Sequence, residues 1–135
     1  MEDEKIRLSL AIIRITTALF FLIWSIEKII APQIAQGVFE KFYGLEITPT
    51  VSTIIGVIQT LIVLGFLAGL FKTFTYGMLL GMHTVSVLST YQQLVNPYQP
   101  PNHLFWAGVP VLGALIALFV LRENDTLFTL NGLND

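Results

Sequence analysis

Four long apolar segments follow one another along the chain, and each is about as long as a helix that crosses a lipid bilayer. These segments cover residues 8–31, 50–71, 74–95 and 104–121. Their apolar residues run continuously instead of alternating with polar ones, which favours helices over strands. A helix also satisfies its own backbone hydrogen bonds in lipid. The pattern predicts an all-α fold: an integral membrane four-helix bundle forming a single transmembrane domain over residues 1–135.

The composition supports a membrane protein and narrows the possible chemistry. Hydrophobic residues make up 54% of the chain and charged residues 12%, whereas soluble domains contain about 25% charged residues. The net charge is −2 without a basic cluster, so we expect no nucleic-acid partner. The chain has no cysteine, which excludes disulfides and thiolate chemistry within it.

The distribution of basic residues predicts an orientation in the membrane. Five of them fall on one side of the predicted bundle: Lys5, Arg7, Arg14, Lys72 and Arg122. Only Lys28 and Lys41 fall on the other side. By the positive-inside rule both termini are cytoplasmic, and we expect a multi-pass protein of the cell (plasma or inner) membrane.

The connection after the first segment, APQIAQGVFEKFYGL, carries a second, shorter amphipathic pattern. Its apolar residues Ile34, Val38, Phe39 and Phe42 share one helical face, while its polar residues point elsewhere. Gly44 is placed to end such a helix. The pattern predicts a short interfacial helix between the first two crossings.

Small residues at four-residue spacing surround the tight turn between the second and third segments. Gly65 and Gly69 come before the turn at Lys72-Thr73, and Gly77 and Gly81 come after it. Because small residues allow helix backbones to approach closely, we interpret these pairs as packing positions.

Two polar stripes indicate which faces of the helices point into the bundle. The first segment carries Arg14, Thr17, Phe21, Trp24 and Lys28 at three-and-four spacing. The third segment carries His83, Ser86, Thr90 and Gln93 in the same way. Polar groups inside a membrane are costly and face protein or water, so we expect both stripes to turn inward.

Depth along the helices groups these polar residues into two predicted layers. Arg14, Gln59 and His83 form one layer, and a second layer near the outer surface combines Glu27, Lys28, Gln92 or Gln93, and His103. Two interpretations remain open: structural hydrogen bonds between helices, or a pocket for the head group of a small ligand. A quinone fits the second, because its two carbonyl oxygens need donors in an apolar slot. The candidate ligand-binding residues are Arg14, Trp24, Lys28, Gln59, His83, Ser86 and Gln93.

The two histidines do not suit a shared haem. His83 lies inside a predicted crossing and His103 at the outer surface, about 18 Å apart along the membrane normal. Glu27 is the one acidic residue within a crossing, which argues against a metal site. We find no nucleophile motif, phosphate loop or zinc signature. We therefore expect no intrinsic cofactor and leave catalytic residues unassigned.

The order of several weak motifs resembles the DoxX-like membrane proteins. The first segment matches in Arg14, Phe20-Phe21, Lys28 and the following Pro32, and VFEKFYGL matches an aromatic stretch that ends in Gly-Leu. A glycine-rich second segment, Leu64-Gly65-Phe66, extends the likeness over most of the chain. His83 and the loop NPYQPPNH are not features of that pattern.

The resemblance implies a membrane subunit or anchor of a quinone-linked oxidoreductase complex, with the redox centre supplied by a membrane or peripheral partner subunit. In that case the chain is a non-catalytic subunit rather than a stand-alone enzyme. Two alternatives remain: a small oligomeric transporter or channel, and a purely structural accessory subunit. Membrane lipids are expected partners in each case, and self-association is the alternative to redox partners.

Overall fold

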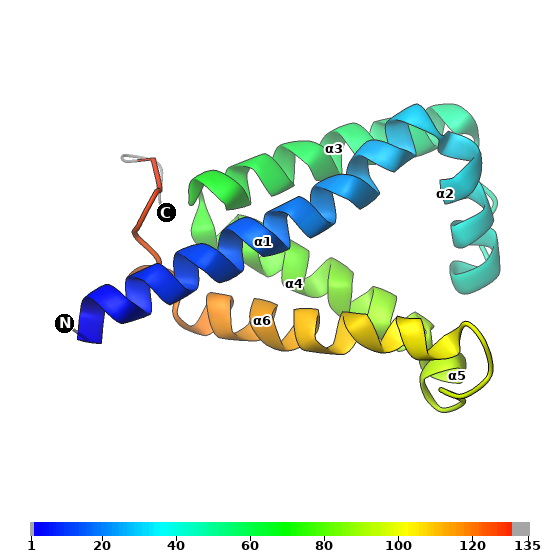
Figure 1. The fold of residues 1–135 in the computed structure, drawn as a ribbon. Coiled ribbons are helices and arrows are strands. Elements are labelled where there is room, and N and C mark those ends of the chain that lie inside the picture. Colours follow the sequence, from blue (N-terminus) through cyan, green and yellow to red (C-terminus); the bar gives the residue numbers. More distant parts are fainter. Residues whose placement is uncertain (1, 131–135) are drawn as a thin grey trace.

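The structure, a computed structural model, describes residues 2–130 of the chain. Over this range it is helical, with no strand (Figure 1). The segments in chain order are α1 (Glu2–Ile30), α2 (Pro32–Val38), the π-helix η1 (Phe39–Tyr43), α3 (Pro49–Ala68), α4 (Lys72–Ser89), α5 (Tyr91–Leu94), the 3₁₀ helix η2 (Asn102–Ala107), α6 (Gly108–Val120) and the 3₁₀ turn η3 (Arg122–Asn124). The prediction of an all-α fold is confirmed.

The four long helices form two pairs that meet at one end of the molecule. Helix α1 packs along α3, and α4 packs along α6. The pairs converge where the α3–α4 turn, the start of α1 and the C-terminal segment lie (Figure 1). They diverge toward the opposite end, which holds α2, η1, α5 and η2. We call these the convergent and the open end.

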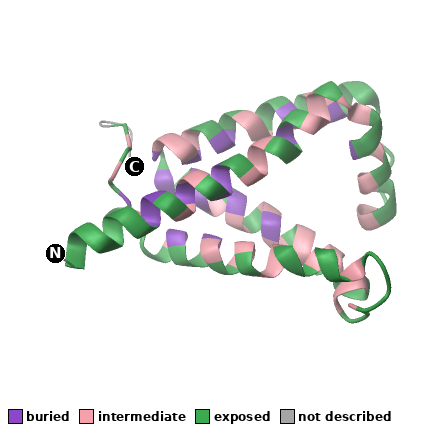
Figure 2. Cartoon of the chain, in the orientation of Figure 1, coloured by how far each residue is buried: buried purple, intermediate pink, exposed green. Residues whose placement is uncertain are grey.

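The packed core lies mainly toward the convergent end, where Figure 2 shows most of the buried positions. Ala18, Phe66, Leu115 and Leu118 are fully buried there, and the rings of Phe66 and Tyr76 lie 4.8 Å apart. The outer faces of the helices remain apolar and exposed, as at Ile23, Ile30 and Val120. Such a large exposed apolar surface is typical of a protein surrounded by lipid.

Within residues 2–130, three helical stretches are long and apolar enough to cross a membrane. They are α1, α3 and the combined stretch Asn102–Val120, which contains η2 and α6. Helix α4, the other predicted crossing, is not among them. It begins at Lys72 and carries threonine, tyrosine and histidine side chains that are buried inside the structure. Three of the four predicted segments therefore form helical stretches that are long and apolar enough to cross a membrane.

The third predicted segment, residues 74–95, is not one continuous helix. Helix α4 ends at Ser89, and Thr90 leaves helical geometry at φ −101° and ψ 20° before the short helix α5. The Thr90 hydroxyl donates to the carbonyl oxygen of Val87 at 2.8 Å. The residues after this break therefore do not continue the helical spacing of α4.

The short helix predicted after the first apolar segment is confirmed. Helix α2 begins with Pro32 and continues into η1, which ends at Gly44 with a left-handed φ of 65°. The Gly44 N–H donates to the carbonyl of Phe39, so the glycine closes the helix as expected. Its position at a membrane surface stays a prediction.

The glycines near the α3–α4 turn have different roles. Gly69 ends α3 in the left-handed region at φ 71°, and the Leu70 N–H donates to the Gly65 carbonyl at 2.8 Å, as in a Schellman cap. A Cβ on Gly65 would lie 3.2 Å from Thr75 Cγ2, so this glycine permits close packing. A Cβ on Gly81 would meet nothing within 4 Å, so the packing interpretation is wrong for Gly81 within this chain.

Helices α1 and α3 come very close together at Gly56, which the sequence pattern did not single out. A Cβ there would lie 2.8 Å from the carbonyl oxygen of Ser25, 2.8 Å from Ile29 Cγ1 and 2.9 Å from Lys28 Cβ. Beside it, the Ser52 hydroxyl donates to the Lys28 carbonyl at 2.9 Å. The absence of a side chain at Gly56 therefore sets the spacing of the first helix pair.

Substitution Gly56→Ala is expected to destabilise the detergent-purified protein by about 1–3 kcal/mol, because the added methyl group overpacks the α1–α3 contact. The melting temperature followed by circular dichroism measures the effect. Gly81→Ala is the matched control, where we expect no loss or a small gain from higher helix propensity. Equal melting temperatures for the wild type and Gly56→Ala would contradict this account of helix spacing.

Candidate functional site

A cavity of about 590 Å³ lies between the two helix pairs toward the open end. Its volume falls in the range of small-molecule sites. The wall is rich in aromatic side chains drawn from three elements, α1, η1 and η2: Phe20, Phe21, Trp24, Phe39, Phe42, Tyr43 and Phe105. The divergence of the helix pairs thus creates an apolar space lined by flat rings.

The helical connections line this space at the open end of the molecule. The rings of Phe42 in η1 and Phe105 in η2 lie 5.8 Å apart. The hydroxyl groups of Tyr43 and Ser86 are hydrogen-bonded at 3.0 Å, which ties η1 to α4. The inward face of the predicted amphipathic helix therefore forms a wall of the cavity, while Ile34 on α2 stays exposed.

Five of the seven sequence-predicted site residues line this one cavity. They are Trp24, Lys28, Gln59, His83 and Ser86. Glu27, which was expected in a separate outer layer, lines it as well. The sequence predicted two separate polar layers. Those of their residues that reach the cavity lie together in its wall.

His83 is held in a fixed orientation in the cavity wall. Its Nε2 lies 2.7 Å from the carbonyl oxygen of Gly108 at the start of α6. The rings of Phe20 and Phe21 stand nearly perpendicular to the imidazole, with centroids at 6.3 and 5.4 Å. A histidine bonded on one side and packed on another presents a defined remaining edge to the cavity.

Gln59 and Lys28 supply polar groups that the described residues leave largely uncommitted. The Gln59 amide makes a single side-chain contact, a weak 3.6 Å hydrogen bond from its nitrogen to the sulfur of Met82. Neither Lys28 nor Glu27 forms an ion pair with any residue in the range 2–130. The cavity thus offers an ammonium group, a carboxylate and a carboxamide to a ligand.

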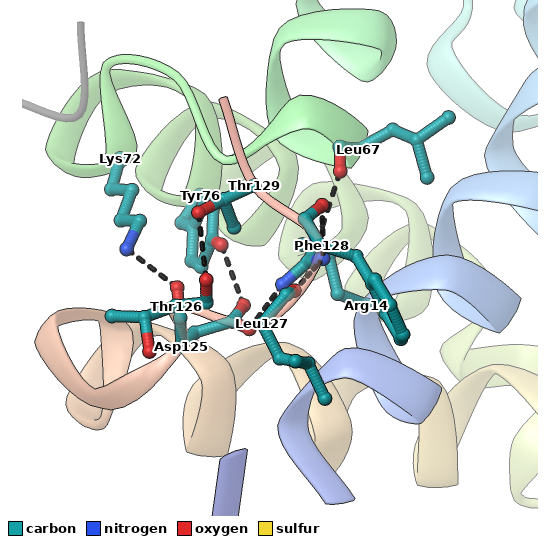
Figure 3. Close-up of polar contacts among 9 residues, drawn as sticks. All are labelled: Arg14, Leu67, Lys72, Tyr76, Asp125, Thr126, Leu127, Phe128 and Thr129. Atoms are coloured by element: carbon teal, nitrogen blue, oxygen red, sulfur yellow. Dashed lines mark hydrogen bonds and ion pairs between the residues drawn. The ribbon is translucent and has the colours of Figure 1, made fainter. Parts of the chain in front are cut away.

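Arg14 does not belong to the cavity, and the predicted layer of Arg14 with Gln59 and His83 is wrong. Its side chain is fully buried at the convergent end, where it forms an ion pair with Asp125 (Figure 3). Nε donates to the Leu67 carbonyl at 3.0 Å, and Nη2 donates to the carbonyls of Leu127 and Phe128 at 2.7 and 3.1 Å. A carboxylate from the C-terminal segment, and not a histidine from α4, neutralises this arginine.

Asp125 is the centre of this buried polar group. One carboxylate oxygen accepts from Arg14 and the other from the Tyr76 hydroxyl at 2.6 Å. The Lys72 ammonium donates to the backbone oxygen of Asp125 at 2.6 Å. We call Arg14, Lys72, Tyr76 and Asp125 the Asp125 cluster; it joins α1, α4 and the segment after α6 (Figure 3).

Gln93 and His103 also fall outside the cavity, contrary to prediction. Gln93 lies in α5, beyond the helix break at Thr90, which removes it from the inward face of His83 and Ser86. His103 is exposed in the 3₁₀ helix η2. The continuous-helix assumption caused the first error, because it carried the three-and-four spacing past the end of α4.

Asp125 is the residue that sequence reasoning missed, since it follows the last apolar segment and looks like part of a polar tail. The sequence contained one chemical indication of the role of Asp125. A buried arginine requires an anion, and Arg14 lies too far from Glu27 on the same helix to pair with it. The acidic stretch Glu123–Asp125 follows the final crossing at the same end of the bundle.

Comparison of this chain with models of protein families, with curated proteins and with solved structures gives no match. The chemistry of the cavity is therefore inferred from the side chains that line it.

Substitution Asp125→Ala is expected to destabilise the protein by about 3–5 kcal/mol, because it leaves the Arg14 guanidinium buried without its counter-ion. Thermal unfolding in detergent measures this loss. Glu123→Ala, at an exposed position two residues away, should change stability by less than about 0.5 kcal/mol.

The double variant Arg14→Met/Asp125→Leu removes both charges and is expected to recover much of the loss. Asp125→Ala with wild-type stability would show that the ion pair does not hold the convergent end together.

Proposed function

We propose that this chain is a membrane protein whose cavity binds a quinone and that it acts as a subunit or anchor of a quinone-linked oxidoreductase complex. The observation that carries the proposal is the cavity itself: an aromatic space of about 590 Å³ with a few uncommitted polar groups in its wall. An apolar pocket with few polar groups is typical of small-molecule sites.

The aromatic lining favours a flat ring as the ligand body. Phe20 and Phe21 pack edge to face at 5.2 Å, and Trp24 lies 6.4 Å from Phe20. Aromatic side chains in such arrangements present faces and edges on which a further ring stacks. A benzoquinone or naphthoquinone ring has this shape, and its isoprenoid tail is compatible with the apolar surroundings.

The polar groups supply donors for carbonyl oxygens. The Lys28 ammonium and the Gln59 amide both line the cavity and are free to donate to a ligand. Hydrogen bonds from charged donors are worth more than neutral ones, so Lys28 is the main anchor for a quinone oxygen. Trp24, whose ring also lines the cavity, carries a further N–H donor.

The chain itself supplies binding groups, and we assign the redox centre to a partner subunit. It has no cysteine to carry electrons, and its cavity residues hold and orient a ring without a paired nucleophile and base. The resemblance to DoxX-like proteins supports the same division of labour, in which this subunit presents the quinone to a membrane or peripheral redox partner.

We further propose a four-crossing bundle with both termini in the cytoplasm, in the cell membrane. Lys72 and Arg122 lie at the convergent end together with the start of α1, and Arg122 donates to the Thr73 hydroxyl at 3.2 Å. Lys28 lies toward the open end. This asymmetry supports a cytoplasmic convergent end by the positive-inside rule, and it places α2 and η1 at the outer surface.

The chain has no cysteine, so a single introduced cysteine reports the orientation without background. Tyr98 is 93% exposed at the open end, and Tyr98→Cys should react in intact cells with a membrane-impermeant maleimide. Glu123→Cys, at the convergent end, should react only after the membrane is disrupted. The reverse pattern would overturn the proposed topology.

The Trp106→Phe protein retains Trp24 as its only tryptophan, so quenching of its fluorescence by a decyl-substituted benzoquinone reports binding in the cavity. In this background we expect Lys28→Met to raise the Kd about tenfold or more, because a hydrogen bond from a charged donor contributes about 1.5–3 kcal/mol. Lys5→Met, at the far end of α1, should leave the Kd unchanged.

Absence of saturable quenching, or an equal effect of the two lysine variants, would reject the cavity as a quinone site. The subunit assignment is examined on protein purified in mild detergent, from which quinone should be extractable and with which a cofactor-carrying subunit should copurify. A preparation without such a subunit would reject the anchor role but leave the binding result intact.

A further inference from the structure

We infer that the cavity binds the dihydroxy form of its ring ligand, the hydroquinone, more tightly than the quinone, with His83 Nδ1 accepting a hydrogen bond from a ring hydroxyl. The inference rests on the proposed function, since it concerns the same cavity. In this inference His83 distinguishes the reduced ring from the oxidised one. Lys28 and Gln59 donate hydrogen bonds to the ring oxygens of both forms.

The partner of His83 Nε2 decides which imidazole nitrogen carries the proton. This nitrogen lies 2.7 Å from the Gly108 carbonyl oxygen, and a carbonyl oxygen only accepts hydrogen bonds. Nε2 must therefore carry the proton. In a neutral imidazole the other nitrogen then has a lone pair and is an acceptor. The sequence suggested that His83 donates a hydrogen bond to a quinone carbonyl. The structure instead gives it an acceptor, Nδ1, on the side away from Gly108.

The second nitrogen of the ring, Nδ1, is accessible. Within residues 2–130 no buried side-chain nitrogen or oxygen lacks a hydrogen-bond partner. His83 makes no hydrogen bond other than that of Nε2. Nδ1 must therefore have accessible surface, although the residue as a whole is buried, and His83 is part of the cavity wall. The acceptor is open to a molecule in the cavity.

The surroundings keep the imidazole from turning over to donate instead. A flipped ring would lose the Gly108 hydrogen bond and disturb the edge-to-face contacts with Phe20 and Phe21. A quinone oxygen facing Nδ1 would bring two acceptors together, which leaves both unsatisfied in an apolar site. A hydroxyl in the same place donates to Nδ1 and forms one hydrogen bond.

The ligand class follows from the presence of acceptors as well as donors in the cavity wall. Nδ1 of His83 and the Glu27 carboxylate accept, while Lys28 and Gln59 donate. A ring with two hydroxyl groups serves both kinds of partner, because each hydroxyl donates one hydrogen bond and accepts others. A quinone has only carbonyl oxygens, so it can accept hydrogen bonds from the donors but cannot donate to the acceptors. The site therefore favours the reduced ring.

The test compares the Kd of a decyl-substituted benzohydroquinone and of its quinone under anaerobic conditions, by Trp24 fluorescence in the Trp106→Phe protein. We expect the hydroquinone to bind about tenfold more tightly, the effect of one additional hydrogen bond. For a bound two-electron couple, a tenfold preference raises the midpoint potential by about 30 mV. The dimethyl ether of the hydroquinone, which cannot donate, should bind no more tightly than the quinone.

His83→Gln is the decisive variant, since its terminal amide can donate to the Gly108 carbonyl in place of Nε2 but has no acceptor at the position of Nδ1. We expect the preference for the hydroquinone to fall to about one, with the quinone Kd little changed. His83→Asn, whose amide oxygen lies near the position of Nδ1, should retain a preference. Gln59→Leu should keep the preference, because it removes a group that both forms use.

The outcomes separate this inference from the proposed function. If both forms bind with equal Kd in the wild type, or if His83→Gln keeps the preference, the role of His83 is wrong while the quinone site stands. If neither form binds, the quinone site and this inference both fail.

Discussion

The buried ion pair between Arg14 and Asp125 is the constraint on which the rest of the fold depends. A guanidinium removed from water is tolerated only when a carboxylate and further acceptors surround it. Here the carboxylate comes from the segment after α6, and the acceptors are the carbonyls of Leu67, Leu127 and Phe128. Elements far apart in sequence must therefore meet at the convergent end for the charge to be satisfied.

That requirement accounts for the shape of the molecule. The Asp125 cluster and the core around Phe66 and Tyr76 hold the helix pairs together at one end. Gly56 lets α1 and α3 remain in close contact beyond that end. The α4–α6 pair diverges from them, and the aromatic side chains of the connecting helices line the space between the two pairs. A tightly satisfied polar cluster at one end and an open aromatic cavity at the other are thus two consequences of one arrangement.

The sequence specifies much of this fold through periodicity and composition. Most of the helical segments and the short helix ending at Gly44 could be predicted, because each depends on local spacing or on a glycine with positive φ. The partner of Arg14 could not, since it depends on the path of the chain after the last apolar segment. The position of Gln93 was missed for a local reason: α4 ends at Ser89, and the chain leaves helical geometry at Thr90. His83 lines the cavity together with Gln59, but its hydrogen-bonding polarity depends on Gly108, which is 25 residues away in sequence.

The distance between α1 and α6 near the convergent end tests the central claim most directly. Spin labels at Ile12→Cys and Val120→Cys, both on exposed faces, report this distance by pulsed electron–electron double resonance in a chain that has no other cysteine. The account predicts a single narrow distance distribution in the otherwise wild-type protein and a broad, longer one when Asp125→Ala is added. An unchanged narrow distribution in the Asp125→Ala protein would contradict it.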